Sequence, residues 1–89
     1  MPTRLSKEAL YMQLAEECCE LGQASAKAAR ILKGENWTPV EYEECKASII
    51  EEYTDVCLVA DILGLSVDYN QYKDKNNRWK KRLDEHPGE

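Results

Sequence analysis

The sequence predicts an all-α fold, in which a three-helix protomer packs into a dimeric or tetrameric helical bundle. Apolar residues recur at spacings of three and four in three successive segments, which is typical of amphipathic helices. Glycine and helix-capping signals separate these segments, and no stretch alternates polar and apolar residues as strands do. With 89 residues, the chain is expected to form one domain over residues 1–89, with a core at about 7–83.

The first helix is expected to begin after Ser6, which can accept a hydrogen bond as the N-cap, and to continue from Lys7 to Lys33. Gly34 then supplies a stop, because glycine readily adopts the positive φ that ends many helices. The first apolar stripe runs through Leu10, Leu14, Glu17, Leu21, Ala24 and Ala28.

The second helix is expected to begin at Thr38-Pro39, with Thr38 as the N-cap, proline in the first turn and Glu41 completing a capping box. It should continue to Leu63 and stop at Gly64. The second apolar stripe runs through Cys45, Ile49, Glu52, Val56, Val59 and Leu63.

The third helix is expected to begin after Ser66 and to run from Val67 to about Asp84. Its stripe is more aromatic than the other two and contains Tyr69, Tyr72, Asn76, Trp79 and Leu83. Stripes of this kind pack helix on helix at small crossing angles. Further apolar positions beside them favour a homodimer or larger bundle, because one three-helix monomer would not need them: Ala15, Cys18, Cys57 and Ala60.

Charge and cysteine content narrow the classes of function. The chain carries 12 basic and 17 acidic residues, a net charge of −5, which argues against a nucleic-acid partner because duplex binding depends on neutralising phosphates. No apolar run approaches the roughly 18 residues of a membrane span, and a polar N-terminal stretch replaces a signal segment, so we expect a cytoplasmic protein without a membrane partner. The cysteines lack a C-x-x-C motif and are expected to be free thiols: Cys18, Cys19, Cys45 and Cys57.

Two carboxylates interrupt otherwise apolar stripes at matched positions. Glu17 and Glu52 each have a second acid three residues later, Glu20 and Asp55, on the same helix face. If the two helices are antiparallel, all four carboxylates can meet, and each pair ~4 Å apart would repel by ~4 kcal/mol at an effective dielectric of 20. A hard divalent cation with oxygen ligands, Mg²⁺ or Mn²⁺, would remove this repulsion.

Other interpretations of these acids stay open. E-x-x-E occurs on many solvated helices, and an acidic face is usually only solvated. A di-iron centre is disfavoured because such bundles use Glu-x-x-His pairs, and the one histidine is His86, near the end of the chain. The same histidine count disfavours zinc.

A basic stripe on the third helix could complement the acids. Lys75, Arg78 and Arg82 share one face, about 100° from the aromatic stripe. They could simply be solvated cations near a helix C-terminus, where the helix dipole favours them. Beside a carboxylate-held Mg²⁺, they could instead bind a polyphosphate.

These motifs resemble those of the MazG-like nucleoside triphosphate pyrophosphohydrolases, a family of the all-α nucleoside triphosphate pyrophosphatase superfamily. E-E-x-x-E is Glu16-Glu17-Cys18-Cys19-Glu20, E-x-x-D is Glu52-Tyr53-Thr54-Asp55, and the basic stripe is similar to the phosphate-binding residues of the family. The resemblance covers residues 7–83, although the 31 residues between the motifs are more than in many relatives.

The resemblance implies Mg²⁺-dependent hydrolysis of a nucleoside triphosphate to a monophosphate and pyrophosphate, in a homo-oligomer. It implies that Glu17, Glu20, Glu52 and Asp55 hold the metal, and that Glu16 orients or deprotonates the attacking water. The basic side chains Lys75, Arg78 and Arg82 would take up charge on the pyrophosphate.

Base recognition is less defined by the sequence. Trp37 lies in the expected linker and is the most available ring for stacking on a base, although it could equally be a hydrophobic staple before the Thr38 cap. Two alternatives to the enzyme remain. One is a non-catalytic interaction module whose acidic stripe positions set helix register, and the other is a nucleotide sensor with a residual metal site.

Overall fold

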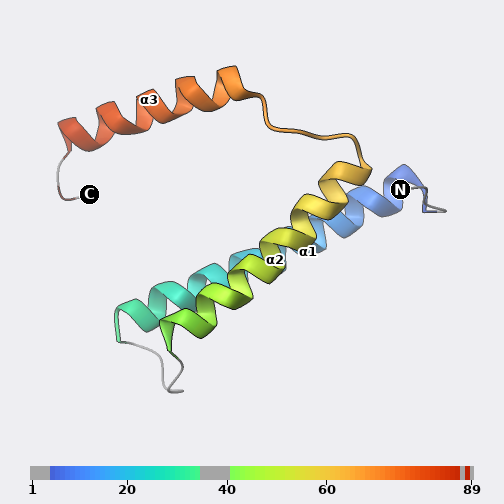
Figure 1. Cartoon of the computed structure of the whole chain (residues 1–89), viewed down its shortest axis with the longest axis horizontal. Coiled ribbons are helices and arrows are strands. Elements are labelled where there is room, and N and C mark those ends of the chain that lie inside the picture. The colour runs from blue at the N-terminus through green and yellow to red at the C-terminus, as the bar shows by residue number, and fades with distance from the viewer. Residues whose placement is uncertain (1–4, 35–40, 87, 89) are drawn as a thin grey trace.

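The computed structural model describes residues 5–34, 41–86 and 88, and this part of the chain is helical and without strands. It contains three helices: α1 over Lys7–Leu32, α2 over Tyr42–Ile62 and α3 over Tyr69–Glu85. The predicted all-α class and the number of helices are confirmed. Figure 1 shows α1 and α2 side by side as an antiparallel hairpin, with α3 set apart from them.

The boundaries of α1 follow the sequence prediction closely. The Ser6 hydroxyl accepts a hydrogen bond from the backbone N–H of Ala9 at 3.1 Å, which caps the first turn. At the other end Lys33 is the C-cap, and Gly34 follows with a φ of +74°, a conformation that costs glycine little because it has no Cβ.

The start of α2 differs from the prediction. The helix begins at Tyr42, with Glu41 as an extended N-cap whose side chain makes no capping hydrogen bond, so the expected role of Glu41 inside the first turn is wrong. The expected cap and proline, Thr38-Pro39, lie outside the described residues. The end of α2 is as expected, since Gly64 has a φ of +77° and Leu65 donates its N–H to the Ala60 carbonyl at 2.9 Å.

The stripes of α1 and α2 face each other and form the core of the hairpin, as predicted. Leu10 and Ala28 on α1 are buried, as are Cys45 and Val59 on α2. The other members of the two stripes are half-buried, and they include the two carboxylates Glu17 and Glu52. The apolar periodicity therefore identified the packed faces of both helices.

The start of α3 also differs from the prediction. The helix begins at Tyr69, and the N-cap is Asp68, whose carboxylate accepts from the backbone N–H groups of Asn70 at 3.0 Å and Gln71 at 3.1 Å. The expected cap at Ser66 is wrong. Both residues are good N-caps, but two N–H groups can converge on the aspartate carboxylate, and the negative charge suits a helix N-terminus.

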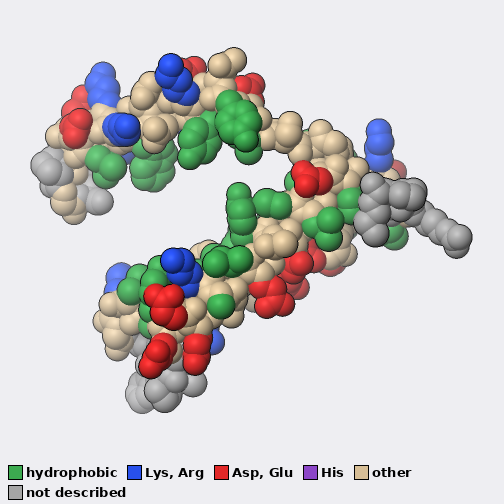
Figure 2. Space-filling view, viewed as in Figure 1, with side chains coloured by type: hydrophobic (Ala, Val, Ile, Leu, Met, Phe, Trp, Pro, Cys, Tyr) green, Lys and Arg blue, Asp and Glu red, His purple; other side chains and the backbone are tan. Residues whose placement is uncertain are grey.

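The third stripe lies apart from the two packed stripes. Among the described residues, α3 does not pack along α1 or α2, although Tyr69 at its start lines a pocket with Cys57, Ala60 and Asp61 near the end of α2. Its apolar stripe is accordingly open to solvent, and Tyr69 and Trp79 retain 78% and 61% of their exposure. Figure 2 shows hydrophobic side chains along the side of α3 that faces the hairpin.

Two further predictions can be compared with the structure. All four cysteines are free, as expected, and only Cys45 is buried. None of the helices in the described part of the chain combines the length and the apolar character that crossing a membrane requires.

The position of the α3 cap can be tested directly. We expect Asp68→Ala to destabilise α3 by about 1 kcal/mol, because it removes both capping hydrogen bonds. Far-ultraviolet circular dichroism during a urea titration would show the loss as reduced helix content. Ser66→Ala is the matched control and should leave helix content unchanged; an effect at Ser66 equal to that at Asp68 would contradict the observed helix start.

Candidate metal centre

Three carboxylates from two helices meet at the middle of the hairpin. Glu17 and Glu20 come from α1 and Glu52 from α2, and one oxygen of each lies within 4.8 Å of the others. Glu17 and Glu52 are half-buried because they occupy stripe positions that face the opposite helix, whereas Glu20 is exposed at the rim. The sequence predicted that four carboxylates meet in an antiparallel pair, and three of the four lie in this group.

The buried part of this cluster is poorly neutralised by the protein. Glu17 Oε1 accepts a hydrogen bond from Gln13 Nε2 at 2.7 Å. Glu17 Oε2 and Glu52 Oε2 are both buried and have no hydrogen-bond donor among the described residues. A buried acceptor without a donor costs about 1–3 kcal/mol, and more when it is charged.

The electrostatics of Glu20 reflect the same crowding. The negative charge of Glu17 raises the pKa of Glu20 above its usual value, and hydrogen bonding to Glu52 and the Glu52 charge raise it further. The cluster therefore attracts positive charge, whether as protons or as a cation.

Two other predicted site residues lie near this cluster without joining it. Asp55 is half-buried on α2, one turn beyond Glu52, but it lies outside the group of three converging carboxylates. Glu16 is exposed and four residues before Glu20, so the two acids occupy one side of α1. Figure 2 shows that acidic side chains gather mainly on the edge of the hairpin turned away from α3.

The predicted phosphate-binding residues are on α3 and are not brought to the carboxylates within this chain. Lys75, Arg78 and Arg82 line a shallow pocket with Trp79, and the Arg82 guanidinium lies 5.7 Å from the centre of the Trp79 ring. Since α3 does not pack along the hairpin, these cations and the acid cluster belong to separate surfaces of one protomer. Trp37, the candidate for base stacking, lies outside the described residues.

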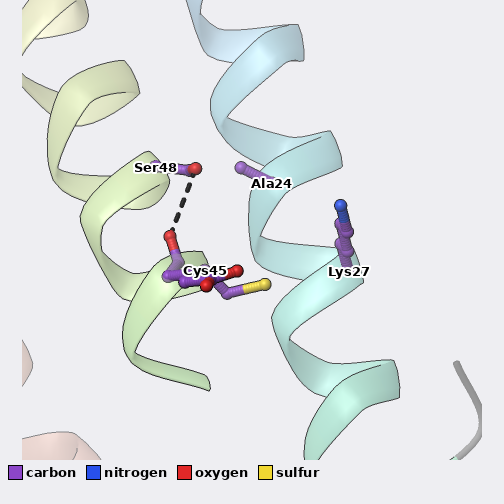
Figure 3. Close-up of a pocket in the computed structure, with 5 residues that line it drawn as sticks. Ala24, Lys27, Cys45 and Ser48 are labelled. Carbon is purple, nitrogen blue, oxygen red and sulfur yellow. Dashed lines mark hydrogen bonds between the residues drawn. The ribbon is translucent and has the colours of Figure 1, made fainter. Parts of the chain in front are cut away.

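A pocket of about 310 Å³ lies between α1 and α2 and was not predicted from the sequence. Figure 3 shows four of its residues, with Ala24 and Lys27 on α1 opposite Cys45 and Ser48 on α2; Glu44 completes the lining. The Ser48 hydroxyl donates to the Glu44 carbonyl at 3.3 Å. Lys27 follows Glu20 by seven residues, and this spacing places both side chains on one helix face. The spacing could have identified Lys27 as a candidate site residue from the sequence.

The three carboxylates suit a hard cation held by oxygen atoms, and Lys27 lines a pocket elsewhere between the same two helices. Carboxylate oxygens are the ligands that Mg²⁺ and Mn²⁺ prefer, and a nearby cation could bind a phosphate. No protein-family model matches the chain, and neither a curated protein nor a solved structure matches it. The chemistry of the site must therefore be argued from its own side chains.

Proposed function

We propose that the protein is a Mg²⁺-dependent nucleoside triphosphate pyrophosphohydrolase that works as a homodimer or tetramer in the cytoplasm. The observation that carries the proposal is the pair of buried carboxylate oxygens on Glu17 and Glu52, which have no donor among the described residues and lie beside Glu20. The free cysteines suit the reducing compartment in which nucleotide pools are found.

The residues present fit a magnesium or manganese ion. Each of Glu17, Glu20 and Glu52 offers one oxygen to a common space, and Asp55 lies one turn from Glu52 to supply a fourth. The site contains no histidine or cysteine that would favour zinc over a hard ion. When bound, the ion would neutralise phosphate charge and lower the pKa of a coordinated water.

The remaining side chains have distinct roles in this proposal. Glu16 is exposed beside the cluster and can accept the proton of a water that attacks the α-phosphorus, which breaks the bond to the pyrophosphate leaving group. Lys27, which lines the pocket between α1 and α2, would bind a phosphate oxygen. Lys75, Arg78 and Arg82 would stabilise the charge of the leaving pyrophosphate when α3 is brought to an acidic face.

A panel of common and modified ribo- and deoxyribonucleoside triphosphates tests the reaction. With millimolar Mg²⁺ we expect pyrophosphate and a nucleoside monophosphate as products, and no release of orthophosphate. Ion-exchange chromatography separates these products, and the best substrate would identify the preferred base. Inactivity on the whole panel, with either Mg²⁺ or Mn²⁺, would contradict the proposal.

A second function is favoured by the exposed aromatic stripe of α3. A helical interaction module would use apolar faces for assembly, and its buried acids would set helix register at a cost in stability. Such a module should bind Mg²⁺ no better than any acidic surface, and combined Glu17→Ala and Glu52→Ala should stabilise it by removing repulsion. A nucleotide sensor would keep the metal site but turn over slowly, so binding without product in the panel would favour it.

A further inference from the structure

Two apolar surfaces of this protomer are left largely open to solvent. The first is the α3 stripe, which consists of Tyr69, Tyr72, Trp79 and Leu83. The second is the outer apolar face of the hairpin, which consists of exposed residues of α1 and α2: Tyr11, Ala15, Cys18, Ile50 and Tyr53. Figure 2 shows hydrophobic side chains on the facing sides of α3 and the hairpin, with an open space between them.

The dimensions of the protomer show how much surface is left uncovered. Its accessible surface is 7785 Å², whereas a folded monomer of 10.2 kDa exposes about 5300 Å². Its radius of gyration is 16.7 Å, against about 12 Å for a compact chain of this length. The excess of about 2500 Å² per protomer is on the scale that obligate homodimers bury.

The connection between α2 and α3 holds α3 away from its own hairpin. On the α2 side, Gly64 has a positive φ and Leu65 is hydrogen-bonded back to Ala60. On the α3 side, Asp68 caps the first turn. Between these fixed ends, Leu65 and Val67 line a pocket of about 390 Å³ with Tyr69 of α3 and residues from the end of α2. Beyond this pocket α3 runs back over the hairpin without packing along it (Figure 1).

Charge favours an α3 helix as the partner of a hairpin. From Tyr42 to Ile62, α2 has one basic and six acidic residues, a net charge of −5. From Tyr69 to Glu85, α3 has six basic and three acidic residues, a net charge of +3. Cations flank the α3 stripe on both sides, with Lys75 and Arg82 on one and Lys73 and Lys80 on the other. An apolar stripe bordered by cations matches an apolar face on an acidic hairpin.

We infer that the protein dimerises by exchanging α3: the α3 stripe of each copy packs on the outer apolar face of the hairpin of a second copy. A two-fold axis makes the two contacts identical, so both copies bury both surfaces at once. The exchange also moves the basic residues of α3 onto a second copy. The inference rests on the homo-oligomeric part of the proposed function and is independent of hydrolysis.

Isotope-filtered NMR on a mixed dimer tests the exchange. One copy is labelled with ¹³C and ¹⁵N, the other is unlabelled, and the two are mixed by unfolding and refolding. We expect intermolecular nuclear Overhauser effects between the Trp79 or Leu83 side chain and residues of the outer apolar face, such as Tyr53. A monomer, or a dimer in which these contacts occur only within one copy, would overturn the inference, even if the wild type hydrolyses nucleotides.

Sedimentation equilibrium gives an independent measure. The double variant Trp79→Ala and Leu83→Ala should raise the dimer dissociation constant about tenfold or more, because aromatic anchors dominate such interfaces. Asn77→Ala, on another face of α3, is the matched control and should leave it unchanged. Circular dichroism verifies that the helices remain. An unchanged dissociation constant in the folded double variant would also overturn the inference.

Discussion

Glu52→Gln is expected to reduce pyrophosphate release by about 100-fold or more while the hairpin stays folded. The substitution keeps the shape of the side chain but removes the charge of the α2 carboxylate that meets Glu17 and Glu20. Loss of a residue that only hydrogen-bonds to a metal ligand lowers metal affinity or activity by about 10- to 100-fold. Loss of a ligand itself should therefore lower activity by at least the upper value. Steady-state assays at saturating Mg²⁺ would measure the change.

The same substitution should have the opposite effect on the metal-free protein. Glu52 Oε2 is a buried acceptor without a described donor, and its charge repels those of its neighbours. Glu52→Gln should therefore raise the urea midpoint in the presence of a chelator. Glu43→Gln, an exposed acid in the first turn of α2, is the matched control and should change neither property. Wild-type turnover by Glu52→Gln would exclude Glu52 as a ligand.

The hairpin was predictable because local sequence and packing agree there. The stripes of α1 and α2 show helical periodicity in the sequence, and their most buried positions, such as Leu10 and Val59, are stripe members. The convergence of Glu17 with Glu52 was expected because both lie near the middle of stripes that pair antiparallel, and the register of the hairpin brings them together. An acid within an apolar stripe therefore indicates a site, because packing of the two stripes brings the acids of both helices close together.

Cap choice and the placement of α3 were less predictable, for different reasons. Ser66 and Asp68 are both competent N-caps two residues apart, and the sequence gives no measure of which one the backbone N–H groups of Asn70 and Gln71 will reach. The α3 stripe has the same periodicity as the packed stripes. Periodicity shows that a face should be covered, but not whether its own chain or another copy covers it.

The pocket lined by Lys27 shows a third limit of prediction from sequence. Lys27 shares a face with Glu20, yet a single lysine on a solvated helix carries little information by itself. It becomes relevant only because Cys45 and Ser48 of α2 form the other wall of the same pocket. That relation depends on the register between the two helices, which the stripes alone do not fix.

Magnesium is expected to stabilise the folded protein, and most strongly where the carboxylates are ionised. An ion that binds only the folded state at ten times its dissociation constant adds about 1.4 kcal/mol, which raises the melting temperature by about 5 °C or more in a chain of this size. Differential scanning calorimetry with Mg²⁺, against Na⁺ at equal ionic strength, measures the gain. Combined Glu17→Gln and Glu52→Gln should abolish it, whereas Glu43→Gln should retain it.

The pH dependence of this gain follows from the raised pKa of Glu20. As the pH falls through that raised pKa, the folded state binds a proton before the unfolded state does, so the metal-free protein becomes more stable. The same proton competes with Mg²⁺, so the magnesium effect should be larger at about pH 7.5 than at about pH 5. A register-setting module should also become more stable as the pH falls, because protonation relieves the repulsion between its acids. It should show no specific stabilisation by Mg²⁺ at either pH. An equal gain from Na⁺ and Mg²⁺ at neutral pH would therefore favour the module and contradict the metal centre.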